Sequence, residues 1–469
     1  MWPQAVLDRL ESDGDRPVFE DGDRIVDGSG MAALIRRMAA GLRSAGVAPG
    51  DGVALQVGVV PEAFAATIAA FAVGARVSGI RPGLTDEQRR HLLSRDDALL
   101  IDAPRLAELA ATPDDRVPLV AAGRPGDIAR IIYTSGSTGY PKGCVQTYAA
   151  MTAAWAAHPD RWPPPIRDLA SRLRRYLVFG SLSSQVMLEY GVLTLAAGGT
   201  MVVAHSPDFP GALVRHRATA SVITVGKLYQ LVRDQREKPV DLTHLGALLV
   251  SGSPVEPGRL AEALDVLGPV VFHGYGQTET GMITMVTPTE MLASEAALAS
   301  VGRPPAVTQL SIRDDAGNPA LEGELFVRTP SQASGYWKDP AETAEVFAGG
   351  WVRTRDLARV GDDGYLRLLG RIRDVIIVNA TLVHAGPIER VLAGHPDVAE
   401  AYVVGRPDER TGEAIHAYVV PTAGRTTTPG PLRRLIVERL GEASVPLTIT
   451  AIDRVPLAPS GKPDKQALT

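Results

Sequence analysis

The sequence predicts an α/β protein. We expect a large N-terminal region of helix-covered, mainly parallel sheets with a small β-rich subdomain, followed by a small α+β C-terminal domain. Between residues 218 and 272, short apolar runs alternate with helical stretches of ten or more residues, a pattern typical of a parallel sheet covered by helices. After about residue 308 the pattern changes to short strands joined by Asp- and Gly-rich turns.

The large region provides most of the expected elements. We predict strands at 52–59, 128–132, 221–225, 247–250 and 270–272, each rich in apolar residues. The expected helices are 31–45, 62–75, 147–157, 227–236 and 256–267.

The β-rich subdomain follows with strands at 309–313, 324–328 and 365–368. The last ~100 residues then form a unit of their own, a size that domain lengths allow. Its helices are expected at 387–392 and 431–440, and its strands at 399–404 and 415–420. We place the boundary near Leu369–Asp374, which gives a large domain over 1–370 and a small domain over 371–469.

Composition excludes several classes of protein. The chain of 469 residues has 48 basic and 53 acidic residues, so its net charge of −5 gives no reason to expect nucleic acid as a partner. No run reaches about 18 apolar residues, so no membrane span is expected. The N-terminus lacks the pattern of a secretory signal, and we expect a cytoplasmic protein. The single cysteine, Cys144, excludes an internal disulfide framework and is interpreted as a packed bystander.

The stretch Tyr133–Gly143 has the composition of an anion-binding loop. Three glycines permit close approach of the backbone, and four Ser or Thr hydroxyls and the backbone N–H groups can face phosphate oxygens. Lys142 adds a positive charge, although the spacing differs from that of a Walker P-loop. A flexible Ser/Gly linker is the alternative. The preceding strand, the following helix and the Pro-Lys-Gly ending favour a phosphate site.

Four further stretches follow this loop along the chain: Gly274–Glu279, Trp351–Asp356, Gly370–Asp374 and Pro459–Lys462. Together the five stretches resemble, in order and spacing, the signatures of the adenylate-forming superfamily of acyl-CoA synthetases, peptide-synthetase adenylation domains and firefly luciferase. The resemblance covers essentially the whole chain and is closest in character to acyl-CoA synthetases. It implies ATP-dependent activation of a carboxylic acid as acyl-AMP, pyrophosphate release, and transfer to a thiol.

The resemblance also implies roles for individual residues. Ser135–Lys142 would cradle the β- and γ-phosphates, Tyr275 would stack on adenine, and Asp356 would bind the ribose hydroxyls. The implied ATP-binding residues are Thr134, Ser135, Gly136, Ser137, Thr138, Gly139, Lys142, Ser251, Gly252, Ser253, Pro254, His273, Gly274, Tyr275, Gly276, Asp356 and Arg371.

Three residues are implied in catalysis. Thr278 would contact the α-phosphate, Glu279 would hold Mg²⁺ as a hard carboxylate ligand, and Lys462 would bridge the acid and the α-phosphate. The alternatives are a solvated carboxylate at a helix start for Glu279, a turn acid for Asp356 and an exposed terminal lysine for Lys462. The turn at 457–461 favours the catalytic interpretation of Lys462.

The resemblance further implies that the small domain is mobile and swings about Arg373 between an adenylating and a thioester-forming pose. The alternative interpretation of Arg373 is a surface arginine at a domain junction. The sequence departs from the family twice: Arg355 replaces the glycine of a Thr-Gly-Asp signature, and Asn379-Ala380 replaces the Gly-Gly or Ser-Gly pair of many acyl-CoA synthetases.

The resemblance also implies which residues line the acyl pocket. By resemblance, the acyl pocket includes Ser183, Ser184, Gly226, Lys227 and Met282. The segment 180–185 contains no acidic residue, and the first one after it is Glu189. This disfavours an α-amino acid as the substrate, because a buried ammonium needs a counter-ion. Lys227 either pairs with a polar substituent of the substrate or is a solvated residue at a helix start.

The expected cofactors are ATP and Mg²⁺, with CoA or phosphopantetheine as the acceptor. The expected partners are a small carboxylic acid and a free-standing acyl carrier protein acting in trans, with neither nucleic acid nor a membrane span. The alternatives are an adenylate-forming enzyme with a nitrogen acceptor, a stand-alone amino-acid adenylation enzyme, and a nucleotide-binding relic. The joint presence of Glu279, Asp356, Arg371 and Lys462 disfavours the relic.

Overall fold

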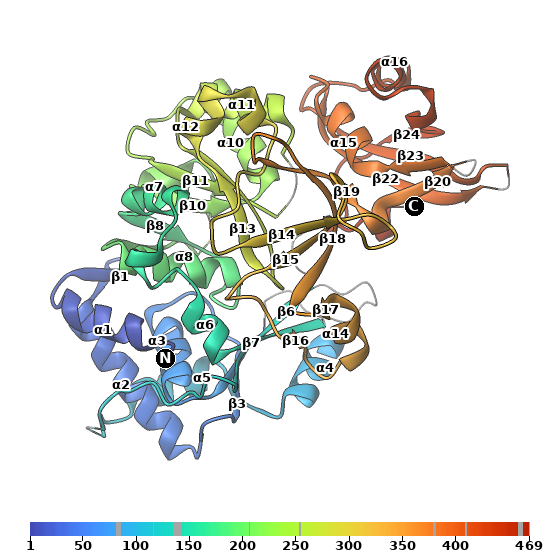
Figure 1. Ribbon diagram of the computed structural model, residues 1–469. Helices are drawn as coiled ribbons and strands as arrows, with labels where there is room; N and C mark the ends of the chain where they lie inside the picture. The colour runs from blue at the N-terminus through green and yellow to red at the C-terminus, as the bar shows by residue number, and fades with distance from the viewer. Residues whose placement is uncertain are drawn as a thin grey trace.

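The protein is an α/β molecule with a large body and a smaller C-terminal unit (Figure 1). The computed structural model describes residues 1–80, 86–115, 117–134, 142–205, 207–252, 255–378, 381–408, 410–457 and 463–468. Mainly parallel sheets in the body and a smaller β-containing unit after it confirm the predicted fold class.

Two sheets of the body have parallel centres. The first has the order β13 (Gly281–Val286), β12 (Val271–Gln277), β11 (Ala247–Val250), β10 (Ala220–Ile223), β8 (Arg175–Val178), β9 (Thr200–Val203), β1 (Pro17–Asp21) and β2 (Arg24–Asp27). The second has the order β16 (Gly335–Tyr336), β7 (Lys142–Thr147), β6 (Ile128–Thr134), β4 (Arg76–Gly79), β3 (Gly52–Leu55) and β5 (Ala98–Ile101). In both sheets the antiparallel strands lie toward the edges.

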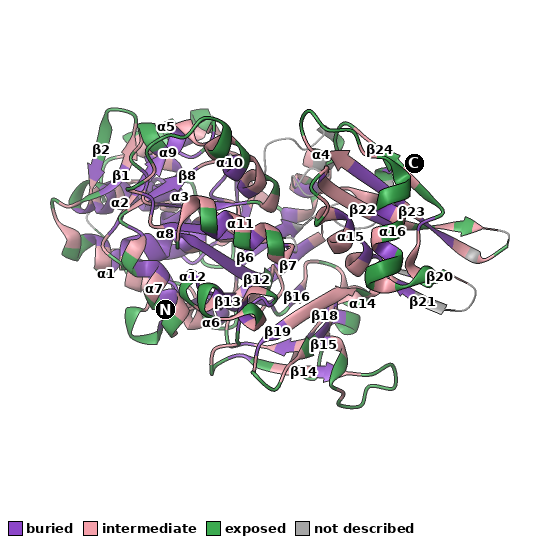
Figure 2. Cartoon of the chain, turned by 90° about the horizontal axis from the view of Figure 1, so that it is seen from above, coloured by how far each residue is buried: buried purple, intermediate pink, exposed green. Residues whose placement is uncertain are grey.

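Helices cover these sheets. They are α1 (Gln4–Asp13), α2 (Gly28–Ser44), α3 (Pro61–Ala72), α4 (Asp86–Asp96), α5 (Ala103–Ala111), α6 (Tyr148–Ala153), α7 (Pro164–Arg172), α8 (Gln185–Ala196), α9 (Gly211–Arg215), α10 (Val225–Glu237), α11 (Pro257–Leu267), α12 (Pro288–Ala293) and α13 (Glu295–Leu298). In α3 every residue except Glu62 is buried, as expected for a helix that is apolar on all sides (Figure 2). It joins α2 and α8 in the largest hydrophobic cluster.

A third, antiparallel sheet forms the β-rich subdomain. Its order is β14 (Gln309–Arg313), β15 (Glu322–Arg328), β18 (Trp351–Val360) and β17 (Phe347–Ala348), and β19 (Leu366–Arg371) pairs with β18. The helix α14 (Pro340–Val346) precedes β17.

The C-terminal unit has its own sheet and hydrophobic cluster. The sheet contains β21 (Thr381–His384), β20 (Val375–Val378), β23 (Gly412–Pro421), β22 (Val398–Asp408) and β24 (Thr448–Ala451). Its helices are α15 (Ala385–Ala393) and α16 (Pro429–Leu440), whose buried residues join the cluster. The η2 turn (Ile372–Asp374) connects β19 to this sheet. The division at 370/371 stays a prediction.

The predicted surroundings of the loop after β6 are wrong in one respect. The helix expected over 147–157 is shorter, because α6 ends at Ala153. The strand β7 (Lys142–Thr147), which was not expected, lies between the loop and this helix. The Thr147 side chain accepts a hydrogen bond from the backbone N–H of Ala150 and caps the helix, and Ala154 is extended. The loop therefore connects two antiparallel strands.

Candidate active site

A tight turn between β12 and β13 holds two of the residues predicted to be catalytic. Thr278 and Glu279 lie in this turn and are half-buried. A Cβ at Gly276 would overlap the Gly281 carbonyl oxygen, so the approach of the two strands requires glycine there. The turn follows the carboxyl end of a strand that pairs in parallel with β11, the position where α/β sheets usually bind ligands.

Glu279 is oriented by a tyrosine from the edge strand β16. The Tyr336 hydroxyl donates a hydrogen bond to Oε1 of Glu279 at 2.7 Å. Burial and the neighbouring Glu279 carboxylate raise the pKa of Tyr336, so the phenol stays protonated and remains a donor. A carboxylate held in this way, with part of its surface accessible, fits a magnesium ligand.

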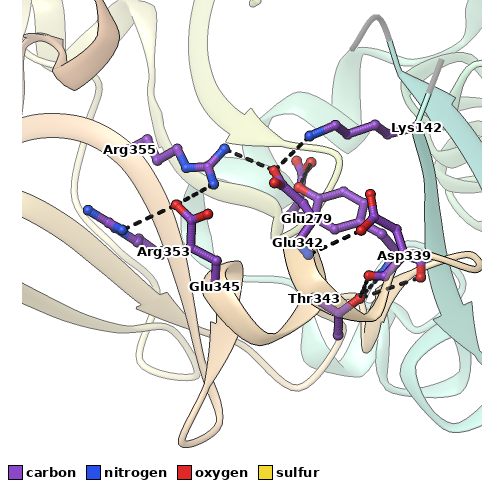
Figure 3. Close-up of polar contacts among 9 residues, drawn as sticks. Lys142, Glu279, Asp339, Glu342, Thr343, Glu345, Arg353 and Arg355 are labelled. Atoms are coloured by element: carbon purple, nitrogen blue, oxygen red, sulfur yellow. Dashed lines mark hydrogen bonds and ion pairs between the residues drawn. The ribbon is translucent and has the colours of Figure 1, made fainter. Parts of the chain in front are cut away.

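A charged cluster lies next to Glu279 (Figure 3). Lys142, the first residue of β7, forms an ion pair with Glu342 of α14 at 2.9 Å. Arg355 contacts the same carboxylate oxygen at 2.9 Å and also pairs with Glu345 at 2.7 Å. Burial raises the pKa of Glu342, but Lys142 and Arg355 outweigh this effect and hold it below its usual range.

Arg355 has a backbone φ of +58°, the left-handed region that favours glycine. The arginine that departs from the family signature therefore keeps the backbone conformation of a glycine. Its side chain is fixed by the two glutamates of α14.

A second polar cluster surrounds Asp356, which is 4% exposed. Its Oδ2 accepts hydrogen bonds from the Tyr275 hydroxyl at 2.6 Å and from Nε2 of Gln277 at 2.7 Å. Its Oδ1 pairs with Nε of Arg371 at 3.0 Å. Burial raises the pKa of Tyr275, and the Asp356 carboxylate raises it further. The structure thus brings together three residues predicted to bind ATP.

Sequence reasoning missed Gln277. Its side-chain amide also donates to the Thr354 carbonyl at 2.9 Å, so it ties the β12 turn to β18. Its partner Asp356 lies 79 positions further along the chain, and nothing local to a glutamine indicates such a contact.

The ends of β11 and β12 place other predicted residues side by side. Val250 pairs with His273, so Ser251 and Gly252 continue beside Gly274. Gly252 has a φ of +91°, which requires glycine. Burial lowers the pKa of His273 to about 4, so its ring is neutral at physiological pH.

Several predicted residues lie outside the described residues. They are Ser135, Gly136, Ser137, Thr138, Gly139, Ser253, Pro254, Asn379, Ala380 and Lys462. Thr134 pairs with Lys142 at the ends of β6 and β7, which fixes both ends of the loop between them. Arg373 lies in the η2 turn.

The segment around Lys462 is bounded by ordered contacts. Leu457 and Pro463 form a β-bridge, so the chain returns to the same place after residues 458–462. Lys465 then forms ion pairs with Asp374 at 2.8 Å and Glu389 at 2.7 Å. Burial lowers the pKa of Lys465, but the two carboxylates outweigh this and raise it overall. These pairs link the end of the chain to the η2 turn, and sequence reasoning missed them.

Two cavities flank α8. Ser183 lines one of them together with Gly79 and Arg130, and Ser184 is the N-cap residue of the helix. Met282 contacts α8 through the Tyr190 hydroxyl, 3.7 Å from its sulfur. Gly226 and Lys227 line neither cavity.

Lys227 lies in the first turn of α10, where the Thr224 hydroxyl accepts a hydrogen bond from its backbone N–H. Its Nζ lies 5.6 Å from the centre of the Phe209 ring. This placement agrees with the alternative interpretation of Lys227 as a residue at a helix start.

Three other features bear on the predicted chemistry. Cys144 is buried in β7, and burial raises the pKa of its thiol. Across the described ranges, no helix has the length and apolarity needed to cross a membrane. The same ranges contain no group of three or more His, Cys, Asp or Glu side chains that could hold a metal ion.

Comparison with known proteins agrees with the resemblance. The AMP-binding enzyme family matches residues 7–337, and its C-terminal domain matches residues 387–462. A feruloyl-CoA synthase of Amycolatopsis sp is 33% identical over 457 residues, 92% of this chain and 91% of that protein.

Two solved structures are similar over nearly their whole length. The amide bond synthetase McbA from Marinactinospora thermotolerans has a TM-score of 0.87, 31% identity and 98% coverage of both chains. The o-succinylbenzoate coenzyme A synthetase MenE from Bacillus subtilis, in complex with ATP and magnesium ion, has a TM-score of 0.84 and 25% identity, and covers 99% of this chain and 98% of that one.

Proposed function

Because the chain belongs to the AMP-binding enzyme family, we propose that it activates a carboxylic acid as acyl-AMP and then transfers the acyl group to a thiol. The family supports an AMP-forming ligase that uses ATP. The observation that carries the proposal is the convergence of Lys142, Glu279 and the Asp356 cluster, which come from different sheets.

In the first step, a carboxylate oxygen of the acid attacks the α-phosphorus of ATP, and the bond to pyrophosphate breaks. Lys142 and the loop before it would hold the phosphates, and Thr278 would contact the α-phosphate. Asp356 would bind the ribose, with Arg371 beside it. Glu279 would hold Mg²⁺, whose charge offsets that of the phosphates. Lys462 would neutralise the two anions as they approach each other.

In the second step, the acceptor attacks the acyl carbon and AMP leaves. The thiol would be that of CoA, with the phosphopantetheine of a free-standing carrier protein as the second choice. The feruloyl-CoA synthase supports CoA by its name. Arg373 would act as the hinge that lets the small domain, residues 371–469, change pose between the two steps.

A nitrogen acceptor is the second candidate function. The similarity to an amide bond synthetase over 98% of both chains favours it, as does Asn379-Ala380 in place of a glycine-containing pair.

The proposal is tested by acid-dependent exchange of labelled pyrophosphate into ATP, measured with a panel of carboxylic acids. Release of AMP is then measured with CoA, with a phosphopantetheinylated carrier protein and with amines. Thiol-dependent release is expected, whereas release that depends only on amines identifies the second candidate. Absence of acid-dependent exchange across the panel contradicts adenylation.

Lys462→Ala separates the two half-reactions. We expect adenylate formation to fall by roughly 10²–10³-fold, because a charge that stabilises the transition state is lost. Transfer from supplied acyl-AMP should change by less than about threefold, since a lysine that acts only in adenylation contributes nothing there. Lys238→Ala, at the exposed end of α10, is the control. Equal loss of both half-reactions would contradict this role.

A further inference from the structure

The second cavity beside α8 contains a carboxylate that the proposed mechanism does not use. The cavity has a volume of about 50 Å³, and much of its wall is apolar, formed by residues such as Met151, Leu188 and Val192. Glu189 lies on the same face of α8 as Leu188 and Val192, one helical turn after Gln185, and lines this cavity.

The cavity begins close to the catalytic turn. Gly281, which lines it, follows Glu279 by two residues, so the two lie within about 7 Å of each other. A substrate whose carboxylate lies next to Thr278 and Glu279 would have to extend past Gly281 to reach the cavity. Gln185 and Ser331 lie near the same glycine, with side-chain atoms within 3.9 Å of the place a Cβ would take there.

The Glu189 carboxylate has no hydrogen-bond or ion-pair partner within the described ranges. It keeps some accessible surface although it lies deep in the protein, because it faces the cavity. Burial raises its pKa to about 7, and the charge of Arg130 opposes this rise. Burying such a group without a partner costs free energy, which a ligand that supplies a donor would recover.

The neighbourhood limits the kind of donor. Arg130 is 6% exposed, lines the same cavity and donates a hydrogen bond to the Ser183 carbonyl at 3.0 Å. Its positive charge already faces Glu189, so a second cation would be repelled in this poorly solvated space. A neutral hydroxyl or N–H group meets no such penalty and satisfies the carboxylate.

We propose that Glu189 is a specificity residue: the substrate is an apolar acid that carries a neutral hydroxyl or N–H donor at the end remote from its carboxylate, and Glu189 accepts that hydrogen bond. The inference rests on the proposed adenylation function and adds the substrate class. A hydrogen bond to an otherwise unsatisfied carboxyl group in a water-poor site corresponds to a discrimination of about 10- to 100-fold.

The test compares matched pairs of acids by acid-dependent pyrophosphate release. Suitable pairs are 4-hydroxycinnamate with cinnamate, and indole-3-acetate with naphthalene-1-acetate. For at least one pair, the wild-type enzyme should show a kcat/KM about 10- to 100-fold higher for the acid with the donor. Glu189→Leu should abolish this preference, and Glu189→Gln, which keeps an acceptor oxygen, should retain part of it. Glu237→Leu, at the exposed end of α10, should leave it unchanged.

The outcomes separate this inference from the proposed function. Equal use of both members of every accepted pair overturns the donor site and leaves adenylation intact. A preference that survives in Glu189→Leu overturns the role of Glu189. No release with any acid defeats adenylation and the inference with it. If Glu189→Leu does not fold, the inference is tested with Glu189→Gln and by measuring the binding of the paired acids through tryptophan fluorescence.

Discussion

At the scale of single residues, Arg355 shows how a departure from a sequence signature can be accommodated. A residue with a Cβ at φ +58° costs roughly 1–2 kcal/mol relative to glycine. The ion pairs with Glu342 and Glu345 offset part of that cost, since partly exposed pairs contribute about 0–1 kcal/mol each. Arg355 also shares Glu342 with Lys142, so its charge affects the candidate phosphate site.

Arg355→Gly should therefore have little effect on the free energy of unfolding and a larger effect on the KM for ATP. The free energy of unfolding should shift by less than about 1 kcal/mol, because relief of the backbone strain opposes the loss of the ion pairs. The KM for ATP should rise about threefold to tenfold, because Lys142 is then the sole described partner of Glu342 and the carboxylate competes more strongly with phosphate for this lysine.

The measurements are urea unfolding and steady-state kinetics at varied ATP. Arg353→Ala is the matched control. Arg353 lies on β18, as Arg355 does, and pairs with Glu345 and Glu324 but not with Glu342. An ATP KM that does not rise in Arg355→Gly, or that rises equally in Arg353→Ala, would refute the link to Lys142.

The candidate site was partly predictable at this scale. Tyr275, Asp356 and Arg371 were expected near one another because their motifs resemble family signatures, and they form one cluster. Gln277 and Tyr336 were not expected, because each acts through a residue distant in sequence. Lys227 was assigned to the acyl pocket by the resemblance, with a residue at a helix start as the alternative, and it lies in the capped first turn of α10.

At the scale of elements, most of the helices and strands that were predicted lie within a few residues of their observed limits, although many observed elements were not predicted. The strand β11 was predicted at its observed limits, and α2, α10 and α11 begin or end within three residues of expectation. β7 was missed because its first residues, Lys142 and Gly143, are polar or small, and the apolar run that follows passes into α6. Pairing with β6, a contact between strands, decides its conformation.

The helix α8 supports a prediction about pH. Burial raises the pKa of Glu189 from 4.5 to about 7, so between these values the folded protein holds a proton that the unfolded chain releases. Glu189 therefore contributes stability below pH 4.5 that is lost as the pH rises to about 7, amounting to roughly 3 kcal/mol.

Glu189→Gln removes this titration. Urea unfolding at intervals from pH 4.5 to 8 should show the wild type losing stability relative to the variant between pH 4.5 and about 7, and a constant difference above pH 7. Parallel profiles for the two proteins would show that the carboxylate is not desolvated in the folded state.

At the scale of the whole molecule, the sequence indicated two units but not how they meet. The alternation of strands and helices predicts parallel sheets, yet the strand orders depend on contacts that no local pattern encodes. The contact between the body and the C-terminal unit also joins residues that are distant in sequence, and no local pattern predicts it. Arg259 of α11 donates hydrogen bonds to the carbonyls of Val398 at 2.8 Å and Ala393 at 3.4 Å.

Arg259→Ala should loosen this contact. Loss of two hydrogen bonds, each contributing about 0.5–1.5 kcal/mol, should increase the population in which the C-terminal unit is undocked. Trypsin cleavage at the junction of β19 and the η2 turn, after Arg371 or Arg373, should then become about fivefold faster or more, because cleavage of an opened form follows its population. Arg236→Ala is the control, since Arg236 pairs with the same Glu262 as Arg259 but lies on α10. Equal cleavage rates in the wild type and Arg259→Ala would mean that Arg259 does not hold the two units together, and the docked arrangement would have to depend on the packing of α15 against β19.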